Sequence, residues 1–471
     1  MTAATFYWYD LETTGTDPKW DRIVQFAGLR TDTELNEIGD AAQFYVRCPI
    51  DVLPNPVASQ VTGLTPQLVE REGVGELEAC AEIARLFTRP NTCVAGFNSL
   101  RFDDEFIRYS FYRHFIDPYA REWQAGNSRW DIIDLARAAA ALRPAGVEWP
   151  LEDGLPSFRL GALAAANGIE HGNAHDASSD VRATLDLARL LRQRQRRLFD
   201  YYLTLRDRTA VQMQLRPERP EIRLHVSRMF ARERSCIAPV MPLARHPTNR
   251  NSVIVADLGR DERPLLEWDV DRLREALFGA DVELRPPLKE VRLNRCPFVA
   301  PLTVLHPDDA RRLGVDMEVA QRRFSALRAD PALSVKIRQV YKAEHGQAVD
   351  ADAALYGSFI GESDRARCAK VLAELRNGHL APPVEFDDAR LNELLFRLRA
   401  RRNIASLSVA ERDRWWTFVK DKLVDGTVGG LTLQQFKSLL LDVDPVNEVG
   451  SALRRHAERI EGLLRDEGKI P

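Results

Sequence analysis

The sequence predicts an α/β amino-terminal domain followed by a β-rich segment and a helical carboxy-terminal region. Strand-like and helix-like segments alternate up to about residue 197, short β-type runs follow from Ile222 to about Leu305, and helix-type patterns dominate from Pro307 onward. A chain of 471 residues suits two or three domains. The 45% hydrophobic and 29% charged residues are typical of a soluble globular protein.

The first predicted strand carries two carboxylates. The stretch from Thr5 to Thr13 is rich in aromatic residues, and Gly15 follows it. Because side chains alternate along a strand, Asp10 and Glu12 should point to the same face. Two acids on one face of a buried strand are costly unless a cation binds there. The alternative is a strand end with solvated acids.

Two more strands and a helix are predicted in the first hundred residues. The short apolar runs from Gln43 to Val46 and from Asn91 to Phe97 predict strands. The run from Leu77 to Thr88 contains neither proline nor glycine and predicts a helix. Together with the first strand, these segments predict a mixed sheet.

A helix is predicted to begin near residue 103. The segment from Asn98 to Glu105 brings three acids to the expected helix start. Asp103 is the candidate metal ligand among them. Because acids are favoured at helix N-termini, capping is the alternative role of Asp103 and the expected role of Asp104 and Glu105.

A second loop-to-helix junction carries a histidine and a further carboxylate. The run from Val181 to Leu191 has apolar residues at helical spacing, so Asp180 should lie in the first turns of a helix. His175 precedes it on the loop side, where it suits a general base beside a metal site. The alternative for His175 is an ordinary solvated histidine.

These residues together predict a two-metal site that hydrolyses phosphodiesters. The reaction needs an attacking hydroxide, charge stabilisation at phosphorus and a stabilised leaving oxygen, and two Mg²⁺ ions about 3.5–4 Å apart supply all three. Mg²⁺ prefers oxygen ligands and leaves positions open for water and phosphate. Mn²⁺ is the expected substitute ion. The predicted catalytic set is Asp10, Glu12, Asp103, His175 and Asp180.

The later part of the chain is organised around one clear boundary. Pro217 and Pro220 mark the end of the α/β domain. The runs from Ile222 to Val226 and from Ser252 to Leu258 predict strands. The runs from Leu391 to Arg401 and from Leu431 to Leu441 predict helices in the last region.

Net charge argues against a protein that binds polyelectrolytes over its whole surface. The formal charge is −3, from 66 basic and 69 acidic residues, so nucleic-acid contacts should be confined to a local groove. One candidate is the stretch from Arg189 to Arg223, with ten arginines against four acids. The alternative is that Arg189 to Arg197 form the solvated face of an amphipathic helix.

Localisation follows from the absence of targeting signals. The sequence has no apolar run of 18 residues and no basic-then-apolar leader, so we expect a cytoplasmic protein without a membrane segment. The cysteines show no Cys-x-x-Cys spacing, which favours reduced, mostly buried thiols over a zinc site or a disulfide framework. They are Cys48, Cys80, Cys93, Cys236, Cys296 and Cys368.

The catalytic set resembles that of the 3′→5′ exonucleases named DEDDh for four acids and a histidine. Within them the chain is similar to the bacterial exonuclease I (exodeoxyribonuclease I) family. The resemblance is dense through about residue 300 and thinner over the last hundred, and the segment from about Gly426 departs from the family pattern. Further matching motifs are Gln25-Phe26-Ala27, Arg30-Thr31-Asp32, Ile116-Asp117-Pro118-Tyr119, Asn127-Ser128-Arg129-Trp130-Asp131, Gly154 to Leu160, Asn167 to His171, and Asn294-Arg295-Cys296-Pro297.

The resemblance implies the fold and the activity. It implies a ribonuclease H-like exonuclease domain at residues 1–198, a small SH3-like β domain with connecting segments at 199–350, and a helical domain at 351–471. The implied activity is Mg²⁺-dependent, processive 3′→5′ degradation of single-stranded DNA to 5′-mononucleotides, in DNA repair and recombination. The two later domains would close around the strand and keep it bound between cuts.

The resemblance also implies roles for single residues. Asp10, Glu12 and Asp180 would be the main metal ligands, and Asp103 would complete the acidic set. His175 would activate the attacking water.

Substrate contacts are implied in the same way. Glu12 and Arg159 would bind the 3′-terminal nucleotide, with a plain surface arginine as the alternative for Arg159. Single strands are held by a charged groove and aromatic stacking, whereas core packing is the alternative for each aromatic. The implied DNA contacts are Arg108, Tyr119, Trp123, Arg137, Asn294, Arg295, Tyr356 and Phe359.

Two alternative functions stay open. A related enzyme acting on RNA ends or short oligonucleotides would have the same carboxylates, although the roughly 270 additional residues favour a long DNA strand. A non-catalytic binding module is the other alternative, but all five catalytic positions are filled. The resemblance further implies a monomer recruited by the acidic carboxy-terminal tail of single-stranded-DNA-binding protein.

Overall fold

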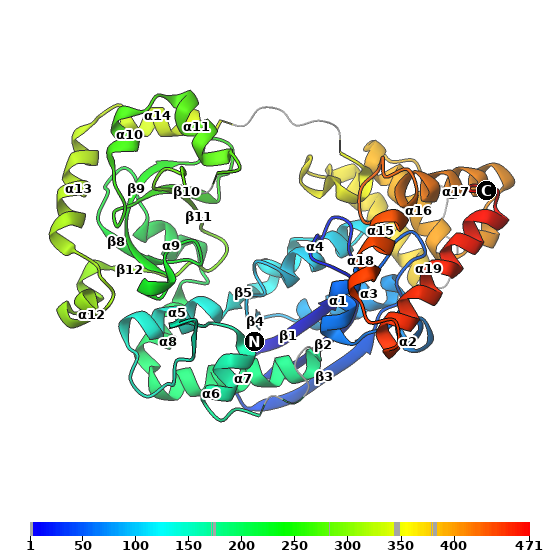
Figure 1. Ribbon diagram of the computed structural model, residues 1–471, viewed down its shortest axis with the longest axis horizontal. Helices are drawn as coiled ribbons and strands as arrows, with labels where there is room; N and C mark the ends of the chain where they lie inside the picture. Colours follow the sequence, from blue (N-terminus) through cyan, green and yellow to red (C-terminus); the bar gives the residue numbers. More distant parts are fainter. Residues whose placement is uncertain are drawn as a thin grey trace. The chain divides into compact units, whose positions relative to one another are not determined.

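The chain folds into two compact units that are each built from separate stretches of sequence. The computed structural model describes residues 3–170, 172, 176–281, 283–342, 349–377, 379 and 384–471. Unit 1 contains residues 1–128, 172–182 and 347–471, and unit 2 contains residues 129–171 and 183–346. The carboxy-terminal helices therefore share one compact body with the amino-terminal sheet (Figure 1).

A mixed five-stranded sheet forms the framework of unit 1. The strand order is β3-β2-β1-β4-β5, with β1 antiparallel to β2 and parallel to β4, and with β2 antiparallel to β3. The division between the units falls within β5. The strands are β1 (Thr5–Thr13), β2 (Ile23–Thr31), β3 (Glu37–Tyr45), β4 (Thr92–Gly96) and β5 (Ser128–Asp131).

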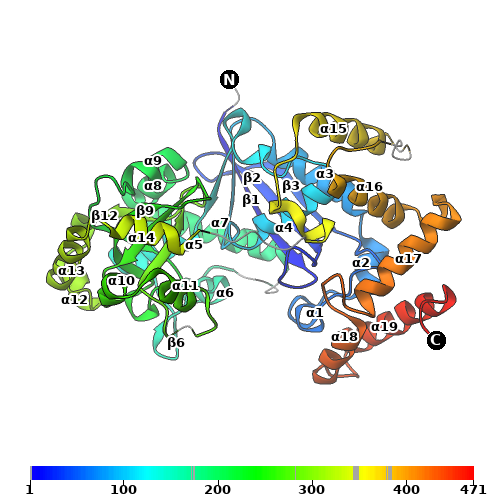
Figure 2. The same cartoon turned by 90° about the horizontal axis from the view of Figure 1, so that it is seen from above.

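Helices from both ends of the chain complete unit 1. Helix α19 packs against α1 and α2, and the one-turn helix η5 (Ala351–Tyr356) packs against α4 and α16 (Figure 2). Helix α7 (Ala177–Arg194) begins in unit 1 and continues in unit 2. The other helices are α1 (Pro56–Thr62), α2 (Pro66–Glu72), α3 (Glu76–Phe87), α4 (Asp103–Arg113), α15 (Glu362–Arg376), α16 (Ala389–Arg402), α17 (Val409–Leu423), α18 (Leu433–Leu439) and α19 (Glu448–Asp466).

Aromatic side chains fill the core between the sheet and α3 and α4. Tyr9 lies against Phe87 with ring centroids 4.9 Å apart, and Phe26 lies against Phe44 at 5.1 Å. A second core joins α4 to α15 and α16 through side chains that include Tyr112, Val371 and Leu394. Helix α4 is consequently held on both sides by apolar burial, which is the main stabilising term in packing.

Unit 2 contains the predicted β segment. Its antiparallel sheet has the order β11-β10-β9-β8-β12. The strands are β8 (Arg223–Val226), β9 (Ile237–Arg245), β10 (Ser252–Asp257), β11 (Leu288–Arg292) and β12 (Val299–Pro301), and a short hairpin adds β6 (Leu151–Glu152) and β7 (Leu155–Pro156). The helices are α5 (Ile133–Leu142), α6 (Leu160–Ala166), α8 (Arg196–Thr204), α9 (Arg208–Gln214), α10 (Arg263–Glu267), α11 (Val270–Phe278), α12 (Pro307–Arg312), α13 (Met317–Ala329) and α14 (Leu333–Val340).

The structure confirms most of the predicted elements, although the strand predicted from Gln43 to Val46 overlaps only the last three residues of β3. The first strand, the helix from residue 77, the helix start at Asp103 and the later strands all lie where the patterns predicted them. All six cysteines are free thiols, and all except the half-buried Cys48 are buried. Among the described helices, none has the length and apolar character needed to cross a membrane.

Candidate active site

Asp10 and Glu12 lie near the carboxyl end of β1, the central strand of the unit 1 sheet. β1 is paired on both sides, by β2 and β4, and its residues Tyr7 and Trp8 are fully buried. Because Asp10 and Glu12 are two residues apart, the pleat directs both carboxylates to one face.

Two helices bring further carboxylates to this face. Asp180 lies in the first turn of α7, and ligand atoms of Asp10, Glu12 and Asp180 lie within 4.8 Å of one another. Asp103 is the first residue of α4, is only 4% exposed, and interacts electrostatically with both β1 carboxylates. The four predicted acids therefore converge from β1, α4 and α7 within unit 1.

Burial and the neighbouring carboxylates raise the affinity of Asp10 and Glu12 for protons. Burial, and then the charges of Asp103 and Asp180, raise the pKa of Asp10 well above its ordinary value. Burial, followed by Asp180 and Asp103, raises the pKa of Glu12 to about 9. A bound cation would offset this repulsion, and the all-oxygen donor set fits a hard ion such as Mg²⁺.

Gln25 connects the metal-binding strand to the start of α7. It is 1% exposed and lies on β2 directly opposite Glu12. Its Nε2 donates to Asp176 Oδ1 at 2.8 Å, and its Oε1 accepts from the Ala177 backbone N–H at 3.4 Å. The Asp180 N–H in turn donates to the Asp176 carbonyl at 3.1 Å. The sheet thereby fixes the turn of α7 that carries Asp180.

The motif that contains Gln25 is visible in the sequence, but the hydrogen bond of Gln25 to Asp176 was not predicted. The partner Asp176 lies 151 residues away, and only the β1–β2 register places Gln25 beside Glu12. Asp176 stands directly after His175, and that neighbourhood was the only available signal.

Family models match the chain in three successive segments. Residues 7–188 match the model described as Exonuclease, residues 206–343 match Exonuclease I SH3-like domain, and residues 349–449 match Exonuclease I C-terminal domain. Exodeoxyribonuclease I of Escherichia coli K12 is 45% identical over 419 residues, which cover 88% of each chain.

The chain belongs to the exonuclease I family. Exodeoxyribonuclease I of Haemophilus influenzae is 41% identical over 434 residues, covering 90% of this chain and 92% of its own. Its membership makes the chain an exonuclease and identifies the unit 2 sheet with an SH3-like domain.

Solved structures of the family have the same fold. Exonuclease I from Methylocaldum szegediense superposes with a TM-score of 0.90 at 42% identity, covering 97% of this chain and all of its own. E. coli exonuclease I in complex with a dA16 oligonucleotide gives the same values. The zinc-bound form of the E. coli complex with single-stranded DNA gives 0.92 at 40% identity, covering 98% and 100%.

The predicted DNA contact Arg108 is engaged inside the protein. This α4 side chain is 5% exposed and donates to both carboxylate oxygens of Glu122, at 2.8 and 3.0 Å. It also donates to Glu105 at 2.9 Å and to the Tyr356 hydroxyl at 3.1 Å. Its guanidinium lies 5.5 Å from the centre of the Tyr119 ring. Arg108 thus organises the surface on which predicted aromatics lie.

Three predicted aromatics in unit 1 have exposed rings. Trp123 is 67%, Tyr356 is 55% and Phe359 is 91% exposed. Tyr356 is oriented by its hydroxyl, which donates to Glu105 at 2.6 Å, and by an edge-on contact with Tyr109 at 5.9 Å. Exposed rings are available for stacking on bases, whereas packing in the core would bury them.

Four predicted substrate contacts lie in unit 2. Arg159 is exposed and pairs with Glu152 at 3.5 Å, just before α6. Arg137 is buried and donates to Asp134 at 2.8 Å. Asn294 and Arg295 are half-buried in the loop after β11, where the Asn294 carbonyl accepts from Arg129 at 2.9 Å.

The arginine-rich stretch in unit 2 has the character of a solvated helix face. Arg189 pairs with Asp186 and Arg196 pairs with Asp200, each at 2.7 Å along its own helix. The alternative proposed for Arg189 to Arg197 accounts for these contacts. His175, the predicted general base, lies outside the described residues.

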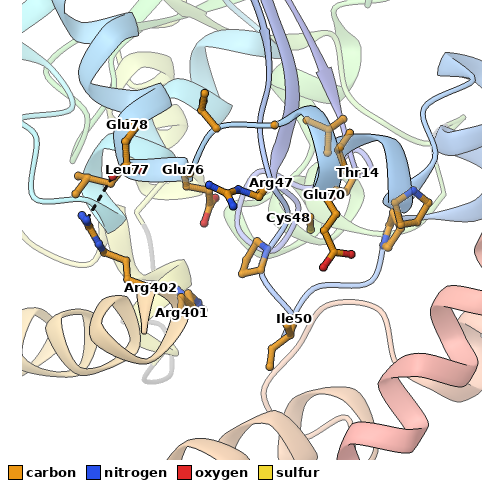
Figure 3. A pocket seen from close by; sticks show the side chains of 18 of the residues that line it. Thr14, Arg47, Cys48, Ile50, Glu70, Glu76, Leu77, Glu78, Arg401 and Arg402 are labelled. Carbon is orange, nitrogen blue, oxygen red and sulfur yellow. Dashed lines mark ion pairs between the residues drawn. The ribbon is translucent and has the colours of Figure 1, made fainter. Parts of the chain in front are cut away.

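A separate cavity lies behind the end of β1. It has a volume of about 960 Å³ and is lined by Thr13 and Thr14, by residues of α2 and α3, and by residues of α16 and α19. Figure 3 shows Glu78 facing Arg402 across it, at an ion-pair distance of 3.3 Å. The four candidate metal ligands, Asp10, Glu12, Asp103 and Asp180, do not line this cavity. It therefore belongs to the junction between the exonuclease fold and the carboxy-terminal helices.

Proposed function

We propose that this member of the exonuclease I family is a Mg²⁺-dependent 3′→5′ exonuclease that degrades single-stranded DNA processively to 5′-mononucleotides, in DNA repair and recombination. The convergence of Asp10, Glu12 and Asp180, with Asp103 beside them, carries the proposal. The solved complexes of E. coli exonuclease I with oligonucleotides support single-stranded DNA as the substrate.

The four acids and the histidine have different proposed roles in the reaction: the acids bind the metal ions, and the histidine is the general base. When bound, two Mg²⁺ ions would supply water activation and charge stabilisation at phosphorus. Asp10, Glu12, Asp180 and Asp103 hold the ions, with Mn²⁺ as a substitute. His175 accepts a proton from the attacking water, because an imidazole titrates near neutral pH.

The DNA contacts separate into direct and indirect ones by exposure. Arg159, Trp123, Tyr356 and Phe359 are exposed and are proposed to touch the strand, with Arg159 and Glu12 at its 3′ end. Aromatic stacking is sequence-tolerant because every base has a π-face.

The buried and half-buried contacts support those surfaces. Arg108 and Arg137 are held by carboxylates and are proposed to position neighbouring groups. Tyr119 in unit 1 and Asn294 and Arg295 in unit 2 are proposed as further contacts of the strand.

Domain organisation supports processivity. We assign the exonuclease domain to residues 1–198, the SH3-like domain to 199–350 and the helical domain to 351–471. Contacts from all three domains would slow dissociation of the strand between cuts. The enzyme is proposed to act as a cytoplasmic monomer, recruited by the acidic tail of single-stranded-DNA-binding protein.

A time course on 5′-labelled DNA tests the proposal. We expect rapid loss of the single strand from its 3′ end with Mg²⁺, no loss in EDTA, and little loss of the matching duplex. Asp10→Ala and Asp180→Ala should remove nearly all activity while the fold is retained. Activity of either variant near that of the wild type would refute the two-metal assignment.

The alternative functions predict different results in the same assay. Faster loss of a matched RNA strand would favour an enzyme acting on RNA ends, because the carboxylates do not read the 2′-hydroxyl. Binding of the strand without cleavage would favour the non-catalytic module. Arg159→Ala should weaken binding of the 3′ end, and unchanged affinity would refute that role.

A further inference from the structure

The segment from about Gly426 packs against the turn that follows the metal-binding strand, and its residues up to 449 lie within the match to the Exonuclease I C-terminal domain. Gly429 has φ = 124°, and a Cβ there would lie 2.5 Å from Cζ2 and 2.7 Å from Cε2 of Trp20. Such distances are below any real Cβ contact, so only glycine allows the indole ring to occupy this position. Gly430 follows at φ = 88°, where a Cβ would meet Trp20 Cβ at 3.4 Å.

A buried lysine lies beside the same ring. Lys422 on α17 is 2% exposed, and its Nζ lies 5.9 Å from the centre of the Trp20 ring. This ammonium donates to Asp51 Oδ2 at 2.9 Å. Asp51 also accepts two hydrogen bonds from Arg401, at 3.0 and 2.7 Å. The contacts of Trp20 with the carboxy-terminal helices are therefore backed by a fully buried ion cluster.

Trp20 lies in a turn that is bonded to the end of β1. The Thr14 N–H donates to the Arg22 carbonyl at 2.8 Å, and the Arg22 N–H donates to Thr14 Oγ1 at 2.9 Å. The Arg22 guanidinium donates to the Trp20 carbonyl at 2.8 Å and pairs with Glu76 at 3.3 Å. The turn therefore begins two residues after Glu12, where the β1–β2 register is already shifted by a bulge.

We propose that Trp20, Gly429, Gly430 and Lys422 form a clamp, here called the Trp20 clamp, through which the carboxy-terminal segment positions Glu12. The clamp fixes the turn from Thr14 to Arg22, and the turn fixes the end of β1 opposite Gln25. This inference rests on the proposed metal-dependent function. It makes Trp20 and Gly429 positioning residues and gives the carboxy-terminal segment a role in the chemistry.

The alternative is that the same contacts contribute only to stability. The two roles differ because support of a metal-binding carboxylate affects metal affinity and turnover, whereas a loss of stability alone leaves the folded enzyme unchanged. Removing an outer support of a metal ligand typically costs about 10- to 100-fold in metal affinity or activity.

The test compares Gly429→Ala and Trp20→Ala with Trp20→Phe and a matched glycine control. Gly468→Ala is the control, because Gly468 also has positive φ, at 66°, but a Cβ there meets nothing within 4 Å. For each folded variant we would measure Mg²⁺ affinity by calorimetry without DNA, and kcat and KM on single-stranded DNA. Hydrogen exchange of the Leu11–Thr14 amides would report the strand end directly.

We expect Gly429→Ala and Trp20→Ala to weaken Mg²⁺ binding and lower kcat about 10-fold or more, with KM nearly unchanged and faster exchange at Leu11–Thr14. Trp20→Phe should keep most of the activity, and Gly468→Ala should match the wild type. If Gly429→Ala does not fold, the comparison of Trp20→Ala with Trp20→Phe decides.

Wild-type Mg²⁺ affinity and kcat in a folded Trp20→Ala variant would overturn the clamp. Failure of the proposed function is distinguishable, since the wild-type enzyme itself would then bind no Mg²⁺ and show no Mg²⁺-dependent cleavage.

Discussion

Glu12 on β1 lies directly opposite Gln25 on β2, and the Gln25 amide holds Asp176 at the start of α7. Through this pairing, Gln25 connects the carboxylate Glu12 to α7, the helix that carries the carboxylate Asp180. A slip of β2 by one residue would turn Gln25 to the opposite face from Glu12. The carboxylate site consequently depends on β2 as much as on the strand that bears its ligands.

Replacing Gln25 should impair catalysis without unfolding the protein. Gln25→Ala removes the buried 2.8 Å hydrogen bond to Asp176, so we expect a fall in kcat of about 10-fold or more with a small change in KM. Gln43→Ala is the matched control, because Gln43 donates to the same Asp176 oxygen at 3.3 Å from an exposed position. Equal rates for the two variants in steady-state assays would contradict this role.

Metal-free protein should lose stability as pH rises. Burial, Asp180 and Asp103 raise the pKa of Glu12 from 4.5 to about 9, so the folded state binds this proton more tightly than the unfolded chain. The stabilisation is present below about pH 4.5 and is lost as pH rises towards about 9, with a slope of up to about 1.4 kcal/mol per pH unit. Thermal unfolding in EDTA should show a shallower fall in Tm for Glu12→Gln than for the wild type. Identical slopes would refute the assignment.

Breaking the buried ion cluster should cost considerable stability. Asp51 is fully buried, and Arg401 and Lys422 hold its pKa well below the usual range. Asp51→Asn leaves both cations undercompensated, so we expect a loss of about 3–5 kcal/mol in the free energy of unfolding in urea.

An exposed ion pair provides the control for that measurement. Glu72→Gln, which breaks the exposed pair with Arg71, should change the unfolding free energy little. Because the pKa of Asp51 is lowered in the folded state, the Asp51 carboxylate stabilises the protein at pH values above its pKa in the unfolded chain. This stabilisation should be lost as pH falls below about 4. Equal effects of the two substitutions would contradict the prediction.

Exposed aromatics should contribute to DNA affinity and not to the chemical step. Trp123→Ala and Phe359→Ala should each weaken binding of single-stranded DNA by about 1–3 kcal/mol, because stacking on bases is lost. Single-turnover rates at saturating DNA should stay near the wild-type value. Exposed Val409, 84% accessible, provides the control substitution Val409→Ala, which should leave affinity unchanged in fluorescence anisotropy.

Local patterns predicted the elements that carry the carboxylates. Two-residue alternation placed Asp10 and Glu12 on one face, and the acidic helix starts placed Asp103 and Asp180 in the first turns of α4 and α7. These features depend on backbone geometry within a few residues, so they can be predicted from a single sequence.

Long-range packing was not predictable in the same way. Asp51 meets Lys422 across 371 residues, and nothing near either residue indicates the other. The domain bounds at 1–198, 199–350 and 351–471 stay a prediction, and no local pattern indicates that residues 347–471 share a compact unit with the amino-terminal sheet. The ion pair between Arg108 and Glu105 is, by contrast, a local feature, because residues three apart on a helix are neighbours.

The buried thiols make the two units separately traceable during unfolding. The buried thiols of unit 1 are Cys80, Cys93 and Cys368, those of unit 2 are Cys236 and Cys296, and Cys48 of unit 1 is only half-buried. Burial raises the pKa of the Cys368 thiol to about 12, and it raises the pKa of Cys80 and Cys236 as well, so little reactive thiolate forms in the native state. An alkylating reagent should therefore label the buried thiols of each unit only when that unit unfolds. Mass spectrometry of the labelled peptides would give the order in which the two units unfold.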